Sequence, residues 1–150
     1  MAAVAYAASL PYVDAQRIAV SGCSLGGIES LFAVQRGTGI VAAIDFSGAA
    51  MTWATNTPLQ ERMRAAAREA KVPVFFVQAA NDYSTAPSLV LSDEMKRAGK
   101  AVRVRVYPPN GTSAEDGHSF CAGGEHPPWG DEVLAFLREA MGADAGRAPR

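Results

Sequence analysis

Short apolar runs alternate along the chain with longer segments in which apolar residues recur at helical spacing. The runs at residues 17–21, 40–46, 74–78 and 101–107 are rich in β-branched and aromatic residues, as buried strands are. The last run, AVRVRVY, alternates valine with arginine and predicts a strand with one solvated face or a place at the sheet edge.

Segments around these runs predict helices. They are residues 2–10, 25–36, 58–70, 88–98 and 131–141. Strands that alternate with helices indicate an α/β fold, a mostly parallel sheet flanked by helices. A glycine-rich loop over residues 108–128 precedes the last helix, and the small, polar tail after residue 142 predicts a flexible end. The length of 150 residues fits a single domain over residues 1–150.

Composition narrows the class of protein. The formal net charge is -1, so there is no electrostatic case for a nucleic acid or anionic membrane partner. The apolar start of the chain lacks the positive region of a signal peptide, and no run is long enough to cross a bilayer. We therefore expect a soluble, cytoplasmic protein with no nucleic acid and no membrane partner.

Two cysteines, Cys23 and Cys121, are too few for a disulfide framework. Reduced thiols are the usual state in a cytoplasmic protein, so two free thiols are predicted and a bridge between them is the alternative. Cys121 and His126 are only two candidate metal ligands, and their spacing is a weak signal for a metal site, so no metal is predicted.

The segment GCSLG, from Gly22 to Gly26, matches the G-x-S-x-G pattern of a nucleophile elbow. It follows the predicted strand RIAVS directly and opens the next predicted helix, which is the setting that such an elbow needs. The turn crowds the positions two residues from the serine, so glycine at both removes clashing Cβ atoms. Ser24 is the predicted nucleophile, and the N–H of Leu25 is the predicted oxyanion donor. The alternative is a turn without chemistry.

Two histidines limit the search for a general base. His118 lies in the loop after the last predicted strand, and His126 lies just ahead of the last predicted helix. Either could reach Ser24 from the carboxyl edge of the sheet, where ligands bind in open α/β folds. His118 is the predicted base because it is nearer the strand end, and His126 is expected to be an exposed loop residue.

The acid that orients the histidine should follow the strand VFFVQ, at a neighbouring strand end. Asp82 lies four residues past that strand and is the predicted acid. Asp45, at the end of the second predicted strand, is the rival, and Asp116 is expected to be solvated. Along the chain the order is then Ser24, Asp82, His118.

Large side chains follow the same strand ends and offer a candidate substrate pocket. They are Met51, Trp53 and Tyr83, together with Phe46. These residues fit the lining of a small apolar pocket and fit core packing equally well, so both interpretations stay open.

Three segments resemble the dienelactone hydrolase family and its esterase relatives, which have the α/β-hydrolase fold. They are VDAQRIAVSGCSLGG, VFFVQAANDYSTAPS and VYPPNGTSAEDGHSF. The resemblance places Ser24, Asp82 and His118 on the nucleophile, the acid and the base, in the chain order of α/β-hydrolases. Dienelactone hydrolase itself is described with a cysteine nucleophile, so serine here points to the esterase members.

The resemblance covers only the C-terminal half of the fold, which implies a truncated α/β-hydrolase lacking the N-terminal strands. The loop that usually supplies the second oxyanion donor belongs to the missing half. The elbow strand would then present an unpaired apolar edge, which invites association. We expect a second copy of the chain to cover this edge in a two-fold dimer.

The residues and the resemblance together predict a serine esterase. It would cleave small-molecule carboxylic esters through an acyl-enzyme intermediate, without a cofactor or metal. Two alternatives stay open: a non-catalytic half-hydrolase remnant used for assembly or ligand binding, and an acyltransferase or peptidase acting with the same residues.

Overall fold

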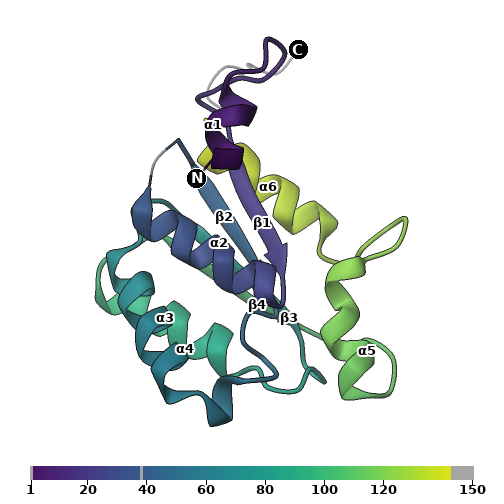
Figure 1. Ribbon diagram of the computed structural model, residues 1–150. Helices are drawn as coiled ribbons and strands as arrows, with labels where there is room; N and C mark the ends of the chain where they lie inside the picture. The colour runs from purple at the N-terminus through teal and green to yellow at the C-terminus, as the bar shows by residue number, and fades with distance from the viewer. Residues whose placement is uncertain (1, 38, 143–150) are drawn as a thin grey trace.

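The computed structural model describes residues 2–37 and 39–142, and the tail that the sequence predicts to be flexible lies outside the described residues. Four strands form one parallel sheet in the order β1-β2-β3-β4 (Figure 1). The strands are β1 (Ala19–Cys23), β2 (Ala42–Phe46), β3 (Val74–Ala79) and β4 (Val102–Tyr107). The predicted parallel sheet is confirmed, and the valine–arginine strand lies at one of its edges.

Helices join consecutive strands and cover both faces of the sheet. Those described are α1 (Ala2–Ala8), α2 (Leu25–Arg36), α3 (Thr57–Glu69), α4 (Ala86–Arg97), α5 (Ala114–His118) and α6 (Gly130–Ala140), with 3₁₀ turns η1 (Trp53–Thr55) and η2 (Ser119–Ala122). The five predicted helices are therefore present, with ends shifted by a few residues. None of the helices within the described ranges is long and apolar enough to cross a bilayer.

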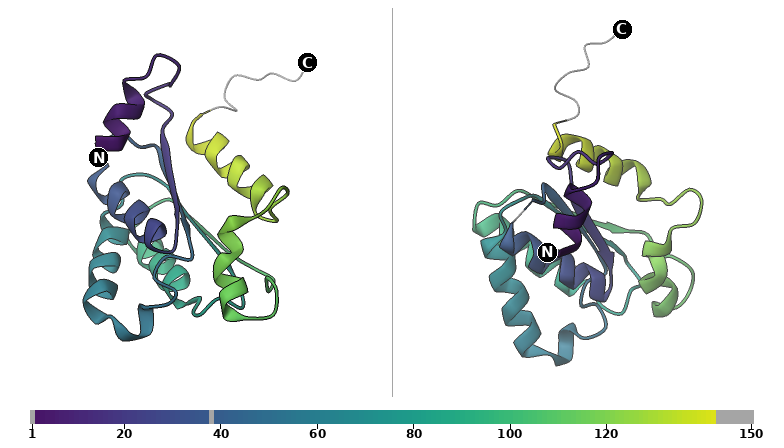
Figure 2. Two further views of the ribbon diagram at one scale, coloured as in Figure 1. Left: turned by 45° about the vertical axis from the view of Figure 1, so that its right-hand side comes forward. Right: turned by 45° about the horizontal axis from the view of Figure 1, so that its top comes forward.

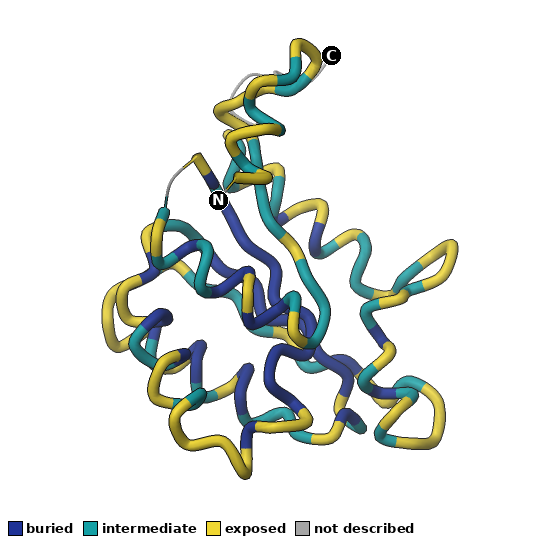
Figure 3. The backbone as a smooth tube through the Cα atoms, in the orientation of Figure 1, coloured by how far each residue is buried: buried dark blue, intermediate teal, exposed yellow. Residues whose placement is uncertain are grey.

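The two faces of the sheet support two separate cores. In Figure 1, α2, α3 and α4 lie on one side of the sheet and α5 and α6 on the other, and Figure 2 shows the same division from two further directions. Successive residues of β3 alternate between the cores: Phe76 packs toward α2, α3 and α4, while Phe75 and Val77 pack toward α6 and η2. The central strands are buried throughout (Figure 3).

The loop predicted over residues 108–128 contains α5 and η2, so the prediction of an irregular segment is wrong there. A capping box begins α5: the Ser113 hydroxyl accepts the N–H of Asp116, and the Asp116 carboxylate accepts the N–H of Ser113. The spacing of serine and aspartate is visible in the sequence. The helix has only five residues, too few for a periodic apolar pattern.

Cys23 and Cys121 form a disulfide, so the prediction of two free thiols is wrong. Their Cα atoms lie 6.0 Å apart although the residues are 98 positions apart in the chain. Only the tertiary fold brings them together, which is why spacing alone did not reveal the pair. Disulfides persist mainly in oxidising compartments, so the predicted cytoplasmic location loses one of its supports.

Strand β1 forms the other edge of the sheet, with β2 as its one strand partner among the described residues. The predicted dimer stays a prediction. Sedimentation velocity should give about twice the 15.7 kDa of one chain. Ser21→Lys should shift the distribution toward monomer, because Ser21 is exposed in mid-strand and an added charge opposes edge pairing. Thr55→Lys, at an exposed position in η1, is the control. A monomeric wild-type chain would contradict the prediction.

Candidate active site

Ser24 occupies the sharp turn between β1 and α2 in a strained conformation. Its φ of 56° and ψ of -112° lie outside the regions that L residues favour. Its N–H donates to the Phe46 carbonyl at 2.8 Å, and its own carbonyl accepts the N–H groups of Gly27 and Ile28. Backbone hydrogen bonds from β2 and from the first turn of α2 therefore hold the strained residue in place.

The two glycines of the motif have different roles. A Cβ on Gly22 would lie 2.3 Å from the carbonyl carbon and oxygen of Gly26, so the turn closes only with glycine at position 22. A Cβ on Gly26 would meet nothing within 4 Å. The prediction that both glycines remove a clash is confirmed for Gly22 and wrong for Gly26, because Gly26 borders a hollow that Val20 and Ser21 also line.

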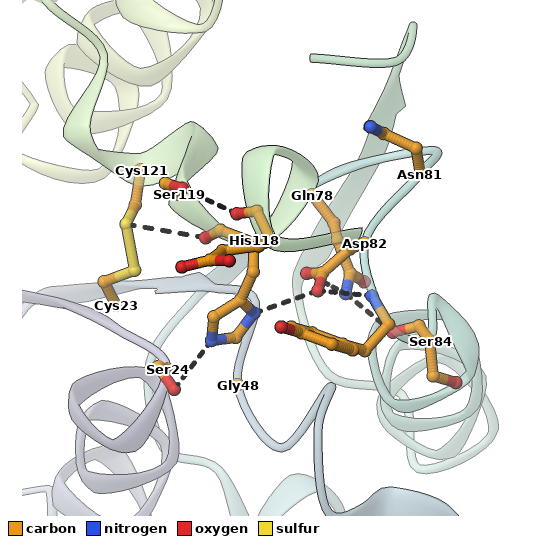
Figure 4. Close-up of polar contacts among 12 residues, drawn as sticks. Cys23, Ser24, Gly48, Gln78, Asn81, Asp82, Ser84, His118, Ser119 and Cys121 are labelled. Atoms are coloured by element: carbon orange, nitrogen blue, oxygen red, sulfur yellow. Dashed lines mark hydrogen bonds and ion pairs between the residues drawn. A yellow bond between two sulfur atoms is a disulfide. The ribbon is translucent and has the colours of Figure 1, made fainter. Parts of the chain in front are cut away.

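His118 links the nucleophile position to the acid position (Figure 4). Its Nε2 atom lies 2.9 Å from the Ser24 hydroxyl oxygen, and its Nδ1 atom lies 2.9 Å from Oδ1 of Asp82. In the tautomer with its proton on Nδ1, the imidazole donates to the carboxylate and Nε2 accepts from the serine hydroxyl. The sequence predicted a loop position for His118, but His118 is the last residue of α5.

Asp82 is held so that both of its carboxylate oxygens are occupied. Its side chain is fully buried, and Oδ1 accepts the N–H of Tyr83 at 2.7 Å as well as the bond from His118. Oδ2 accepts the side-chain amide of Gln78 at 2.7 Å, and the amide oxygen of Gln78 accepts the hydroxyl of Ser88 at 2.8 Å. Sequence reasoning missed Gln78, a polar residue inside the apolar run of β3.

Asn81 attaches the acid loop to the segment that carries the histidine. Its amide donates to the carbonyls of Asn110 and Ser113, both at 2.8 Å, and its oxygen accepts the N–H of Asn110 at 2.9 Å. A Cβ on Gly117 would lie 2.6 Å from the backbone of Asn81 and Asp82, so α5 packs directly on this loop. Sequence reasoning missed Asn81, whose only signal was its place beside Asp82.

Comparison with protein families shows the class to which this arrangement belongs. The family model named "Dienelactone hydrolase family" matches residues 1–135, most of the chain. The chain belongs to the dienelactone hydrolase family. The resemblance noted in the three segments is thereby confirmed.

Solved structures similar to this family member include two peptidases and an esterase. The Mycobacterium tuberculosis puromycin-hydrolyzing peptidase has a TM-score of 0.69 and 18% identity, over 93% of this chain and 25% of that one. The Pyrococcus horikoshii acylaminoacyl peptidase has a TM-score of 0.65 and 19% identity, over 86% of this chain and 25% of the peptidase chain. The Pyrococcus furiosus esterase has a TM-score of 0.62 and 15% identity, over 84% of this chain and 54% of the esterase chain. A search of curated proteins found no match.

These likenesses show the α/β-hydrolase fold and its extent. The chain spans about a quarter of the two peptidase chains and about half of the esterase chain. The fold is therefore that of part of an α/β-hydrolase, as the sequence predicted.

Asp45, the rival acid, lies behind the elbow of this dienelactone hydrolase family member. It is 1% exposed, and Oδ1 accepts the N–H of Gly48 at 2.8 Å, while Oδ2 has no hydrogen-bond partner among the described residues. A Cβ on Gly27 would lie 2.2 Å from Oδ1. Burial raises the pKa of the Asp45 carboxyl to about 7, although the Gly48 N–H lowers it. Of the two carboxyls, Asp82 is the one bonded to the histidine.

Asp116 and His126, the other titratable candidates, lie apart from the hydrogen-bonded chain. Hydrogen bonds from Ser113 and then from the N–H of Thr112 lower the pKa of the Asp116 carboxyl, so Asp116 serves as a cap and is not merely solvated. His126 is exposed, as predicted.

The candidate pocket residues divide into core and surface. Trp53 is 6% exposed and packs in the core with Ile28 and Met63, which supports the packing interpretation for it. Phe46 is also a core residue. Tyr83 and Met51 are 47% and 58% exposed, and the Tyr83 ring centroid lies 5.5 Å from that of the His118 imidazole.

Leu25 stands at the first position of α2, with its side chain 65% exposed. The first N–H groups of a helix lack partners within the helix. The positive end of the helix dipole is also at this position. The Leu25 N–H is therefore suited to donate a hydrogen bond to an oxygen that becomes negatively charged beside Ser24.

Replacing Asp45 should change how stability depends on pH. Below its ordinary pKa of 3.8, Asp45 is protonated in both the folded and the unfolded chain. Above that value Asp45 ionises in the unfolded chain first, so the folded state becomes less stable as the pH rises, until the folded pKa of about 7 is passed. Asp45→Asn should therefore gain stability relative to wild type between pH 4 and pH 8, by roughly 2–4 kcal/mol.

Urea unfolding at both pH values checks this expectation. Asp93→Asn, which changes an exposed carboxylate to an amide, is the matched control and should show a much smaller change. An Asp45→Asn difference that stays constant with pH would mean that Asp45 ionises alike in the two states, contrary to the burial argument.

Proposed function

We propose that this chain is a serine hydrolase that cleaves carboxylic esters with Ser24, His118 and Asp82. The observation that supports the proposal is the continuous hydrogen-bonded path from the serine hydroxyl through the imidazole to the buried carboxylate, with 2.9 Å at each step. A path of this kind activates a serine because the imidazole can accept its proton while the carboxylate holds the ring in the correct tautomer.

The proposed reaction is acyl transfer to water in two halves. Nε2 of His118 removes the proton from Ser24 as the hydroxyl oxygen bonds to the ester carbonyl carbon. The N–H of Leu25 donates to the negative oxygen of the tetrahedral intermediate, whose collapse expels the alcohol with the proton from His118. Water then attacks the acyl-enzyme in the same way and releases the carboxylic acid and the free serine.

The surroundings favour a small ester as substrate. The side chains of Leu25 and Tyr83, which flank the nucleophile and the base, are 65% and 47% exposed, so an acyl group can approach from solvent. Of the three neighbouring structures described above, one is named an esterase and two are named peptidases. A peptidase or acyltransferase would use the same three residues, and a panel of p-nitrophenyl esters, peptide anilides and competing acyl acceptors distinguishes these activities.

A fluorophosphonate probe tests the nucleophile directly. The wild-type chain should be labelled at close to one probe per chain, with mass spectrometry placing the adduct on Ser24, because only an activated serine attacks phosphorus quickly. Ser24→Ala should abolish labelling, and Ser21→Ala, an exposed serine on β1, should not. A well-folded wild-type chain that takes up no probe would favour the non-catalytic remnant.

The acid assignment predicts a large kinetic effect with an intact fold. Asp82→Asn should lower kcat by about 10⁴-fold, because an amide at this position disfavours the tautomer that accepts the serine proton. Asp45→Asn is the matched control on the rival carboxyl and should leave kcat within about 10-fold of wild type. Steady-state hydrolysis of p-nitrophenyl acetate, with circular dichroism as a check of folding, measures both. A larger loss in Asp45→Asn would reverse the assignment.

A further inference from the structure

The Cys23–Cys121 disulfide connects the two segments that meet at the proposed catalytic pair. Cys23 ends β1 and immediately precedes Ser24, while Cys121 lies in η2, three residues after His118. Figure 4 shows the bridge beside the Ser24–His118 contact. The cysteine Sγ in η2 also lies 3.9 Å from the His118 carbonyl oxygen, so the bridge is in contact with the base residue itself.

The remaining connections between these segments are sparse. Hydrogen bonds from Asn81 fix the start of α5 to the acid loop, not to the elbow. Among the described residues, the polar side-chain contact between residues 114–122 and the elbow is the His118–Ser24 hydrogen bond itself. Strand β1 is paired on one side alone within the described ranges. The disulfide is therefore the strong constraint on the separation of nucleophile and base.

Apolar packing surrounds the bridge without enclosing it. Both cysteines pack against the core cluster that contains Phe46 and Phe120, and both retain intermediate exposure. A small thiol in solution can therefore reach the sulfur atoms, and a partly exposed disulfide is the kind that exchanges with thiols.

We propose that this disulfide is a positioning device for the catalytic pair, and that its reduction lowers turnover. The inference rests on the proposed function. In the reduction, a dithiol gives two electrons to the Cys23–Cys121 bond and becomes a cyclic disulfide. The two protons of the dithiol pass to the cysteine sulfurs, so both cysteines become thiols. The elbow and η2 can then separate, and a shift of about 1 Å between reacting groups can cost about 100-fold in rate.

Active-site titration separates positioning from folding. The oxidised chain and the dithiol-reduced chain, freed of reductant under nitrogen, are each divided in two: one portion is titrated with the fluorophosphonate probe, and the untreated portion is assayed with p-nitrophenyl acetate. We expect kcat per titrated site to fall by 10- to 100-fold on reduction with KM nearly unchanged, and to return on reoxidation. The Cys23→Ser/Cys121→Ser double variant should match the reduced chain and should not respond to dithiol.

Each other outcome overturns the inference in a distinguishable way. An unchanged kcat per site in the reduced chain would show that the bond does not position the pair. A fall in the number of titratable sites with constant kcat per site would show that the bond acts only on folding. Absence of labelling in both redox states of a folded chain would instead overturn the proposed function. If the double variant does not fold, reduction and reoxidation of wild type still decide.

Discussion

The left-handed backbone of Ser24 is the constraint on which the rest of the site depends. A residue with φ of 56° is strained, and it persists because the Phe46 carbonyl and the first turn of α2 hold its backbone. The residue two positions before it, Gly22 in β1, must lack a Cβ because a Cβ there would clash with Gly26. The hydroxyl is thereby raised at the carboxyl end of the sheet, where the loops after β3 and β4 also arrive.

Two buried aspartates near this elbow show how environment sets the state of a carboxyl group. Asp82 accepts hydrogen bonds at both oxygens, from Gln78, Tyr83 and His118. Asp45 accepts one, from a backbone N–H, and burial raises the pKa of its carboxyl to about 7. The first therefore has a hydrogen-bond donor at each oxygen, whereas burial of the second disfavours its charged form. The aspartate with more hydrogen-bond donors, Asp82, is also the one that contacts the imidazole.

Local sequence patterns determined the fold and most of the candidate site. The period of apolar positions along a strand or a long helix follows its local backbone geometry, so that period and the alternation of strands with helices were enough to predict a parallel sheet. The elbow is likewise local, since Gly22 and Ser24 lie in one turn. Asp82 and His118 followed from a topological rule, that strand ends of a parallel sheet meet at one edge. The capping box that begins α5 is also formed by residues close together in the sequence, but α5 was too short to show a periodic pattern of apolar residues.

Tertiary structure alone decided the features that join distant parts of the chain. The disulfide spans 98 residues, and the core position of Trp53 depends on α2 and α3 packing together. The roles of Gln78 and Asn81 arise from partners on other elements, which no spacing encodes. The physical reason is common to all of them: a contact between remote residues is set by how the layers pack, and the sequence near each residue contains no record of its partner.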